Sequence, residues 1–307
     1  MLLQITEFKS LVDLLKKFPD EKTCIEHIEA IRWNDNVISP FDETSKVYKC
    51  AGFKYKCKNT GKYFNFRTGT IFENTNVSLQ KWFMAIYLVN NHKKGISSHQ
   101  LAKDIEITQK SAWFLLHRIR YAFGHENFQK ILNDVIQADE TFAGGKNKNR
   151  HADKKVLNSQ GRLFKDKTPV LGLMQNGHVN LSVIPNTQAE TIKPIIEQMV
   201  KEGSIIISDD WDAYKSISDK YFHVIVDHQN GEYVKGAFHT NSVEGFWSHF
   251  KRTIYGTYHQ VSSKHLHRYC SESAFRYNTR KAKDPQRFNL CLTSIDKRLT
   301  YKELIQK

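Results

Sequence analysis

The chain has 307 residues, of which 40% are hydrophobic and 12% aromatic, and its formal net charge at pH 7 is +14. This apolar content excludes an intrinsically disordered chain, and the length allows more than one domain. A folded protein with so much positive charge is suited to a polyanionic partner, because lysine and arginine neutralise phosphates.

Membrane insertion and disulfide stabilisation are both disfavoured by the sequence. No run approaches the ~20 apolar residues needed to span a bilayer. The five cysteines form no CxxC pair and no framework of close, even spacings. We therefore expect reduced thiols in a cytoplasmic setting and no membrane partner.

Residues 1–75 form the first predicted domain. An amphipathic helix begins the chain, and from residue 46 Tyr, Phe and Val alternate with Lys and Arg between punctuating glycines. This alternation predicts a small antiparallel β-unit with one basic face.

Zinc binding by this β-unit stays open. Cys50 and Cys57 suggest half of a zinc ribbon, but the second thiol pair that such a site needs is missing. Asp42 and Thr60 stand near where further ligands would be expected. The unit is therefore predicted as a degenerate relative of a zinc ribbon.

Residues 76–128 are predicted to form a helix-turn-helix domain. After one helix that starts near residue 79, two more helices are separated near Glu106, with Ser98 and Thr108 as their expected caps. A basic second helix after a short turn is typical of DNA-binding units, although an ordinary helical hairpin has the same pattern. The residues expected on its exposed face are Gln109, Lys110, Ser111, His117 and Arg118.

Residues 129–285 show mixed α/β order, and residues 286–307 are predicted as a helical tail. The larger zone contains a strand ending at Asp139, a hairpin around Asn176-Gly177, a helix, two strands and a long helix. This element order is typical of a ribonuclease-H-like fold. The predicted class is therefore α/β, with such a core preceded by the β-unit and the helix-turn-helix.

Three acidic residues of this zone are candidates for one site. Asp139 and Asp209 follow β-branched runs, where a strand would end, and Glu244 lies in a segment with helical spacing. Carboxylates delivered in this way can hold divalent metal ions, and two such ions can activate and stabilise oxygens in phosphodiester chemistry. Solvated strand ends are the alternative. The neighbouring acids that compete for the assignment are Glu140, Asp210 and Asp212.

The helix around Glu244 is predicted to have two different faces. Asn241, Glu244, Ser248 and Lys251 fall on one face by their spacing. We expect Lys251 to touch a phosphate near the metals, with Arg252 extending the basic stripe. The residues expected to pack against the sheet are Phe246, Trp247 and Phe250.

Several stretches resemble the ISXO-type insertion-sequence transposases of the DDE superfamily. They are ADETFAGGK, ISDDWDAY and HTNSVEGFWSHFKRTIYGTYHQVSSKHLHRYCSESAFRYN, and KWFMAIYLVNNHKKGISSHQLAKDIEITQKSAWFLLHRIR resembles the family's helix-turn-helix. The resemblance covers roughly residues 20–285. It implies two Mg²⁺ or Mn²⁺ ions held by Asp139 and Asp209, a third ligand at Glu244 or Asn241, and Lys251 in the family's lysine place.

The resemblance also implies the partners and the reaction. We expect a bacterial DNA transposase that binds insertion-sequence ends, cleaves strands and joins them to target DNA. It would act as a homo-oligomer on double-stranded DNA in the cytoplasm, associated with the nucleoid when bound. Two alternatives stay open, a catalytically silent DNA-binding relative and a nuclease without strand transfer.

Overall fold

The structure, a computed structural model, describes residues 7–144, 151–155, 167–209, 213–214, 219–226 and 238–306. The chain forms two compact units, one of Met1–His125 with Lys281–Lys307 and one of Glu126–Arg280. The first two predicted domains and the C-terminal tail thus share the first unit. Within the described ranges, no helix combines the length and apolar character needed to cross a membrane.

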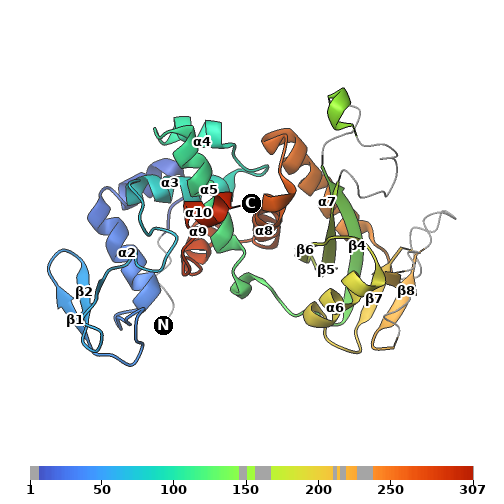
Figure 1. The fold of residues 1–307 in the computed structure, drawn as a ribbon, viewed down its shortest axis with the longest axis horizontal. Coiled ribbons are helices and arrows are strands. Elements are labelled where there is room, and N and C mark those ends of the chain that lie inside the picture. The colour runs from blue at the N-terminus through green and yellow to red at the C-terminus, as the bar shows by residue number, and fades with distance from the viewer. Residues whose placement is uncertain are drawn as a thin grey trace. The chain divides into compact units, whose positions relative to one another are not determined.

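The first unit is mainly helical (Figure 1). Its helices are α1 (Leu11–Lys17), α2 (Glu21–Trp33), α3 (Leu79–Asn91), α4 (Ser98–Asp104), α5 (Gln109–Phe123), α9 (Asp284–Leu292) and α10 (Tyr301–Ile305). Phe288 of α9 is fully buried, and its ring lies 5.1 Å from that of Phe83 on α3 and 5.5 Å from that of Phe8. The C-terminal segment is therefore part of this unit's core.

The first unit also contains the predicted antiparallel β-unit. Its strands are β1 (Val47–Cys50), β2 (Lys54–Cys57) and β3 (Tyr63–Phe64), in the order β1-β2-β3. Tyr55 and Phe64 are buried on the inner face, where both rings contact Trp33 of α2 edge to face. Aromatic pairs in this geometry add to the free energy of area burial. One face of the small sheet is thus packed against α2.

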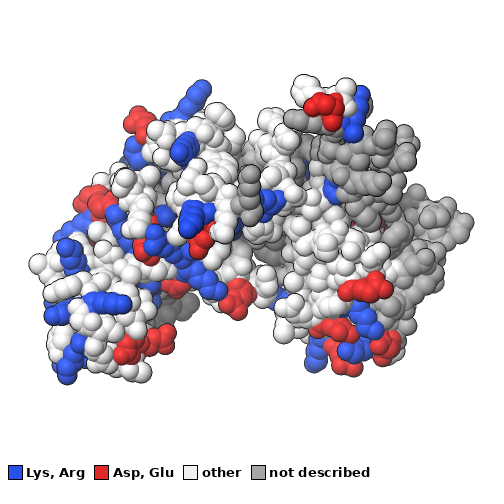
Figure 2. Space-filling model, in the orientation of Figure 1, with Lys and Arg blue, Asp and Glu red and all other residues white. Residues whose placement is uncertain are grey.

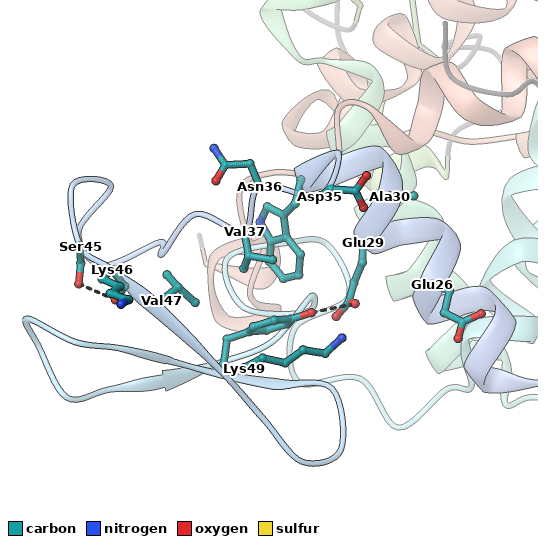
Figure 3. A pocket seen from close by; sticks show the side chains of 12 residues that line it. Glu26, Glu29, Ala30, Asp35, Asn36, Val37, Ser45, Lys46, Val47 and Lys49 are labelled. Carbon is teal, nitrogen blue, oxygen red and sulfur yellow. Dashed lines mark hydrogen bonds between the residues drawn. The ribbon is translucent and has the colours of Figure 1, made fainter. Parts of the chain in front are cut away.

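A cavity of about 610 Å³ lies beside this packing, between α2 and the strands β1 and β2 (Figure 3). Within it the hydroxyl of Tyr55 donates a hydrogen bond to Oε2 of Glu29 at 3.0 Å. Burial raises the pKa of Glu29 above its ordinary value. The protein's own polar and aromatic groups thereby line this cavity on the inner side of the sheet.

Cys50 and Cys57 do not form a ligand pair, because they lie on opposite faces of the sheet. Val47 pairs with Cys57 and therefore shares its face, whereas Cys50 is three residues further along the same strand. Burial alone would raise the pKa of the Cys57 thiol, but hydrogen bonds with Ser39, Ser45 and Thr60 lower it to about 6. All five cysteines are free.

The second unit is built on a five-stranded mixed sheet. Its strands are β4 (Val135–Ala143), β5 (Thr168–Gln175), β6 (His178–Val183), β7 (Ile205–Ser208) and β8 (Phe222–Ile225), in the order β6-β5-β4-β7-β8. Strands β4, β5 and β6 are antiparallel, and β7 and β8 run parallel to β4. Asn176 and Gly177 both have positive φ, as the predicted hairpin turn requires. The mixed α/β sheet is consistent with a ribonuclease-H-like core.

Helices cover both faces of this sheet. On one face α6 (Ala189–Met199) buries Ile192 and Ile196 against the central strands. On the other face α7 (Asn241–Thr253) and α8 (Ser263–Asn278) form a second apolar cluster. A π-helical segment, Ile254–Tyr258, continues α7, and short 3-10 turns lie at Glu126–Phe128 and Ala152–Lys154.

Candidate active site

The register of the sheet brings Asp139 and Asp209 side by side. Strand β4 pairs in parallel with β7 up to Gln137 and Ile207, and Asp209 directly follows the end of β7. Continuing that register by two residues places Asp209 opposite Asp139 on the same face, at a strand spacing of about 4.8 Å. Both side chains are half-buried.

Asp139 does not end its strand, so that part of the sequence prediction is wrong. Strand β4 continues to Ala143 because β5 pairs with it along its whole length, from Gln137 to Ala143. Asp139 therefore lies in the middle of a central strand. Its backbone is held on one side by β5 and, near it, on the other side by β7.

Helix α7 is attached to this part of β4 by two hydrogen bonds. The backbone N–H of Val243 donates to Oε1 of Gln137 at 3.1 Å, and Nε1 of Trp247 donates to Oδ2 of Asp139 at 2.9 Å. Gly172, the partner of Asp139 on β5, leaves room for the indole, since a Cβ there would lie 2.6 Å from Trp247. The indole thus packs against the sheet and orients one carboxylate.

The electrostatic setting of Asp139 is unusual for an aspartate. Burial, together with the negative charges of Asp209 and Glu244, raises its pKa to about 6. Hydrogen bonds from the Glu140 backbone and the Trp247 indole act in the opposite direction. The three acidic side chains are therefore near enough to influence one another's charge.

Glu140, a competing candidate, belongs to the opposite face of the sheet. Its carboxylate accepts a hydrogen bond from the hydroxyl of Tyr214, which is buried in the core under α6. Burial and the negative charge of Glu140 raise the pKa of Tyr214 well above its usual value. Alternation along β4 thus separates Glu140 from Asp139. The other two competitors, Asp210 and Asp212, lie outside the described residues.

The exposed face of α7 carries the remaining candidates. Asn241, Glu244, Lys251 and Arg252 are all exposed, and the expected packing of Phe246, Trp247 and Phe250 against the sheet is confirmed by their burial. Oε1 of Glu244 accepts a hydrogen bond from the Thr240 hydroxyl at 2.7 Å. This bond keeps the carboxylate within the first turn of α7.

The donor set fits a divalent cation in part. Asp139 and Asp209 offer hard oxygen ligands on one face, and their mutual repulsion is the kind that a cation relieves. In the part of the chain that the structure describes, however, no three His, Cys, Asp or Glu side chains are gathered closely enough to hold a metal ion. The two aspartates therefore suit a metal as a pair of oxygen ligands.

The helix-turn-helix prediction agrees with α4 and α5 in position. Thr108 caps α5 as expected, accepting from the Ser111 backbone at 3.2 Å. Ser97, not Ser98, caps α4, and the Ser98 hydroxyl instead accepts from Nε2 of Gln109 at 2.8 Å. The first turn of α5 presents Gln109 and Lys110 to solvent, with Ser111 half-buried.

His117 and Arg118 were expected on the exposed side of α5, and this is wrong. Both are buried, with 0% and 3% of their surface exposed. The Arg118 guanidinium donates to the backbone oxygens of Leu299 at 3.1 Å and Ile71 at 3.0 Å, and burial lowers its pKa to about 10. Arg118 therefore joins three segments of the first unit and is not available to DNA.

Comparison with known families agrees with the division of the chain into two units. Residues 131–278, nearly all of the second unit, match the family described as the ISXO2-like transposase domain. The second unit therefore carries a DDE transposase domain of the ISXO2-like kind.

Individual relatives point the same way. The chain is 28% identical to an uncharacterized protein in transposable element ISH50 of Halobacterium salinarum, over 78% of this chain and 85% of that protein. It is also 28% identical to a transposase-like protein of Haemophilus influenzae, over 33% of this chain and 81% of that protein. Both relatives are named for mobile elements or transposases.

Among solved structures, the chain is similar to one from the Mos1 Strand Transfer Complex. The identity is 12%, the coverage is 71% of this chain and 79% of that chain, and the TM-score is 0.22.

Three residues near the carboxylates escaped the sequence analysis in these roles. Gln137 anchors α7, Gly172 makes room for the indole, and the indole of Trp247 binds Asp139. Alternation along the strand could have placed Gln137 on the face of Asp139. The partnership of Trp247 with Asp139 spans 108 residues, and no local pattern indicates it.

Proposed function

We propose that the protein is a DNA transposase that binds insertion-sequence ends, cleaves their strands and transfers them to target DNA. The observation that carries this proposal is the register of β4 and β7, which supports Asp139 and Asp209 as neighbours on the face beneath α7. The chain is basic and carries an ISXO2-like transposase domain, which supports the DNA backbone as the substrate of this pair of carboxylates.

Asp139 and Asp209 would hold Mg²⁺ or Mn²⁺, with Glu244 completing the ligand set. Two bound ions supply charge stabilisation for the attacking and leaving oxygens of the phosphodiester. Glu244 is preferred to Asn241 because its charge acts on Asp139 in this fold. Its bond with Thr240 would have to open for Glu244 to reach the aspartates.

The remaining residues of the proposed site act on the DNA directly. Lys251 and Arg252 lie exposed in the last turn of α7, where their charges can neutralise phosphates beside the carboxylates. In the first unit, the exposed first turn of α5 is suited to a major groove. Gln109, Lys110 and Ser111 would make those contacts. Arg118 is withdrawn from the set because it is buried.

The test is a reaction of the full-length protein with labelled element-end DNA, with and without Mg²⁺. We expect metal-dependent nicking at the 3′ ends, followed by joined products when target DNA is added. Asp209→Asn should abolish both products while duplex binding stays intact or becomes slightly tighter, because a negative charge near phosphate is lost. Asp219→Asn, which removes an exposed acid paired with Lys193, is the matched control and should react normally.

Each alternative has its own outcome. Nicking without joined products would identify a nuclease that lacks strand transfer. Tight binding of element ends with no nicking in the presence of Mg²⁺ or of Mn²⁺ would identify a silent DNA-binding relative. Normal cleavage by Asp209→Asn would remove Asp209 from the ligand set and make Asp210 the next residue to test.

A further inference from the structure

The outer face of the small sheet in the first unit consists almost entirely of lysine and tyrosine. Because alternate residues of a strand share a face, the burial of Tyr55 and Cys57 on the inner face assigns their neighbours to the outer one. The pairing of β1 with β2 and of β2 with β3 extends this assignment to the other strands. The outer residues are Lys46, Tyr48, Cys50, Lys54, Lys56, Lys58 and Tyr63.

Two tyrosines and one lysine form a row across this face. Tyr48 pairs with Lys56, and Lys56 pairs with Tyr63. The tyrosines are 43% and 61% exposed, so their rings stand at the surface. Two strand spacings separate them, roughly 10 Å. A single extended strand can contact both rings at once.

Lysine ammonium groups lie against these rings. Nζ of Lys56 is 5.5 Å from the ring centroid of Tyr63, and Nζ of Lys46 is 5.5 Å from that of Tyr48. A third pair follows the same pattern nearby, with Nζ of Lys62 5.3 Å from the ring of Phe41, which is 40% exposed. Each of these aromatic rings is thus in contact with a lysine ammonium group.

The charge of this segment has one sign only. From residue 46 to residue 72 the sequence has no Asp or Glu, and its basic residues are Lys46, Lys49, Lys54, Lys56, Lys58, Lys62 and Arg67. Figure 2 shows lysine and arginine side chains gathered at the end of the first unit where Figure 1 places β1 and β2. The face is therefore complementary to a polyanion along its whole length.

We propose that this outer face binds single-stranded DNA, with Tyr48 and Tyr63 stacking on unpaired bases and the lysines contacting the phosphates. A face of lysines alone would be equally suited to a duplex, because the phosphates of a duplex lie on its outside. Exposed rings set between lysines suit a strand whose bases are free to stack. The proposal rests on the proposed function in taking DNA as the partner, but it uses none of the carboxylates and none of α5.

The test uses the full-length protein and measures fluorescence anisotropy with a thymidine oligonucleotide of about 15 nucleotides and with a scrambled duplex of equal length. Tyr48→Ala with Tyr63→Ala should weaken oligonucleotide binding by at least about tenfold, since each stacked base contributes on the order of one factor of ten. Duplex binding should change much less. Tyr48→Phe with Tyr63→Phe keeps the rings and should bind the oligonucleotide like the unaltered protein.

Phe222→Ala is the matched control, because it removes a ring that is 69% exposed on β8 of the second unit. It should leave oligonucleotide binding unchanged. Lys46→Ala with Lys58→Ala should reduce the dependence of oligonucleotide binding on salt concentration, as expected when phosphate contacts are lost. Thermal melting of each variant confirms that it is folded.

Several results would overturn the proposal. The double tyrosine variant could lose affinity equally for duplex and oligonucleotide, or lose affinity for neither. The unaltered protein could bind RNA of the matching sequence more tightly than the DNA oligonucleotide, or a polyglutamate peptide could compete for binding as effectively as DNA.

Failure of the proposed function is seen separately. If element ends are not cleaved while the tyrosine-dependent binding persists, the transposase proposal fails and this one stands.

Discussion

The two faces of the five-stranded sheet use neighbouring acidic residues in opposite ways. On the α7 face, Asp139 lies beside Asp209, is half-buried and has a pKa raised to about 6. On the α6 face, Glu140 accepts a hydrogen bond from Tyr214, which is enclosed in the apolar core. Burial and the charges of Asp209 and Glu244 raise the pKa of the first acid despite its bond with the Trp247 indole, whereas the described contacts of the second include a buried hydroxyl donor.

This contrast shows how a single-residue step along a strand changes the chemistry of a carboxylate. A half-buried carboxylate that is crowded by other negative charges is poised to bind a cation. A charge that is satisfied by a buried hydroxyl contributes to packing and has little left to offer a ligand. The following predictions test whether the two faces differ in this way.

The largest expected difference is in cleavage. Asp139→Asn should reduce the rate of metal-dependent strand cleavage on the order of a thousandfold, because the metal's contribution to charge stabilisation is several kcal/mol. Glu140→Gln keeps an acceptor for Tyr214 and should cost roughly tenfold at most. Single-turnover cleavage of element-end DNA measures both. Equal losses in the two variants would mean that the faces do not differ in function.

The second prediction concerns the stability of the metal-free protein. The pKa of Asp139 is about 6 in the folded state and 3.8 in its ordinary state, so the folded protein binds this proton more tightly. The resulting stabilisation is complete below pH 4 and is lost as the pH rises through 6, with a total of up to about 3 kcal/mol. Asp139→Asn should remove this dependence.

The measurement is urea unfolding in EDTA at pH 4 and pH 7.5. The Asn variant should gain stability relative to the unaltered protein only at the higher pH. Adding Mg²⁺ at pH 7.5 should stabilise the unaltered protein and not the variant, since a ligand that binds the folded state raises its stability. A variant that gains equally at both pH values would show that the pKa of Asp139 is not raised in the folded protein.

The third prediction addresses the packing that holds α7 on its face of the sheet. Gly172→Ala would place a Cβ 2.6 Å from the Trp247 ring, and overpacking of this kind costs about 1–3 kcal/mol. Gly245→Ala on α7 meets no atom within 4 Å and should be neutral or stabilise the helix by up to about 1 kcal/mol. Urea unfolding compares them. Equal stabilities would contradict a close contact between β5 and the indole.

Much of this arrangement could be predicted from sequence because it is local. β-branched runs marked the central strands, Asn176-Gly177 marked the hairpin turn, and the apolar positions of α7 marked its buried side. Those signals depend on residues within a few positions of one another. The same local signals indicated the three acidic candidates, although they did not decide whether Asp139 or Glu140 is the ligand.

The errors concern residues whose partners are distant in sequence. Arg118 has the spacing of an exposed helical residue, yet its acceptors belong to Ile71 and Leu299, 47 and 181 residues away. A guanidinium can be buried where backbone oxygens satisfy it, and nothing in the helix itself reveals such acceptors. The extension of β4 beyond Asp139 has the same origin, because it depends on pairing with β5.

The smallest expected effect tests the hydrogen bond that orients Asp139. Trp247→Phe retains an aromatic ring but removes the Nε1 donor, which stabilises the charged carboxylate. The pKa of Asp139 should therefore rise further, and the acidic limb of cleavage should move to higher pH by up to about one unit. Phe246→Leu perturbs the same apolar cluster without touching that bond and serves as the control. The cleavage rate is measured against pH at fixed Mg²⁺. A shift that is the same in both variants would attribute the effect to packing, whereas a shift confined to Trp247→Phe would identify the indole as the group that tunes the acid on the α7 face.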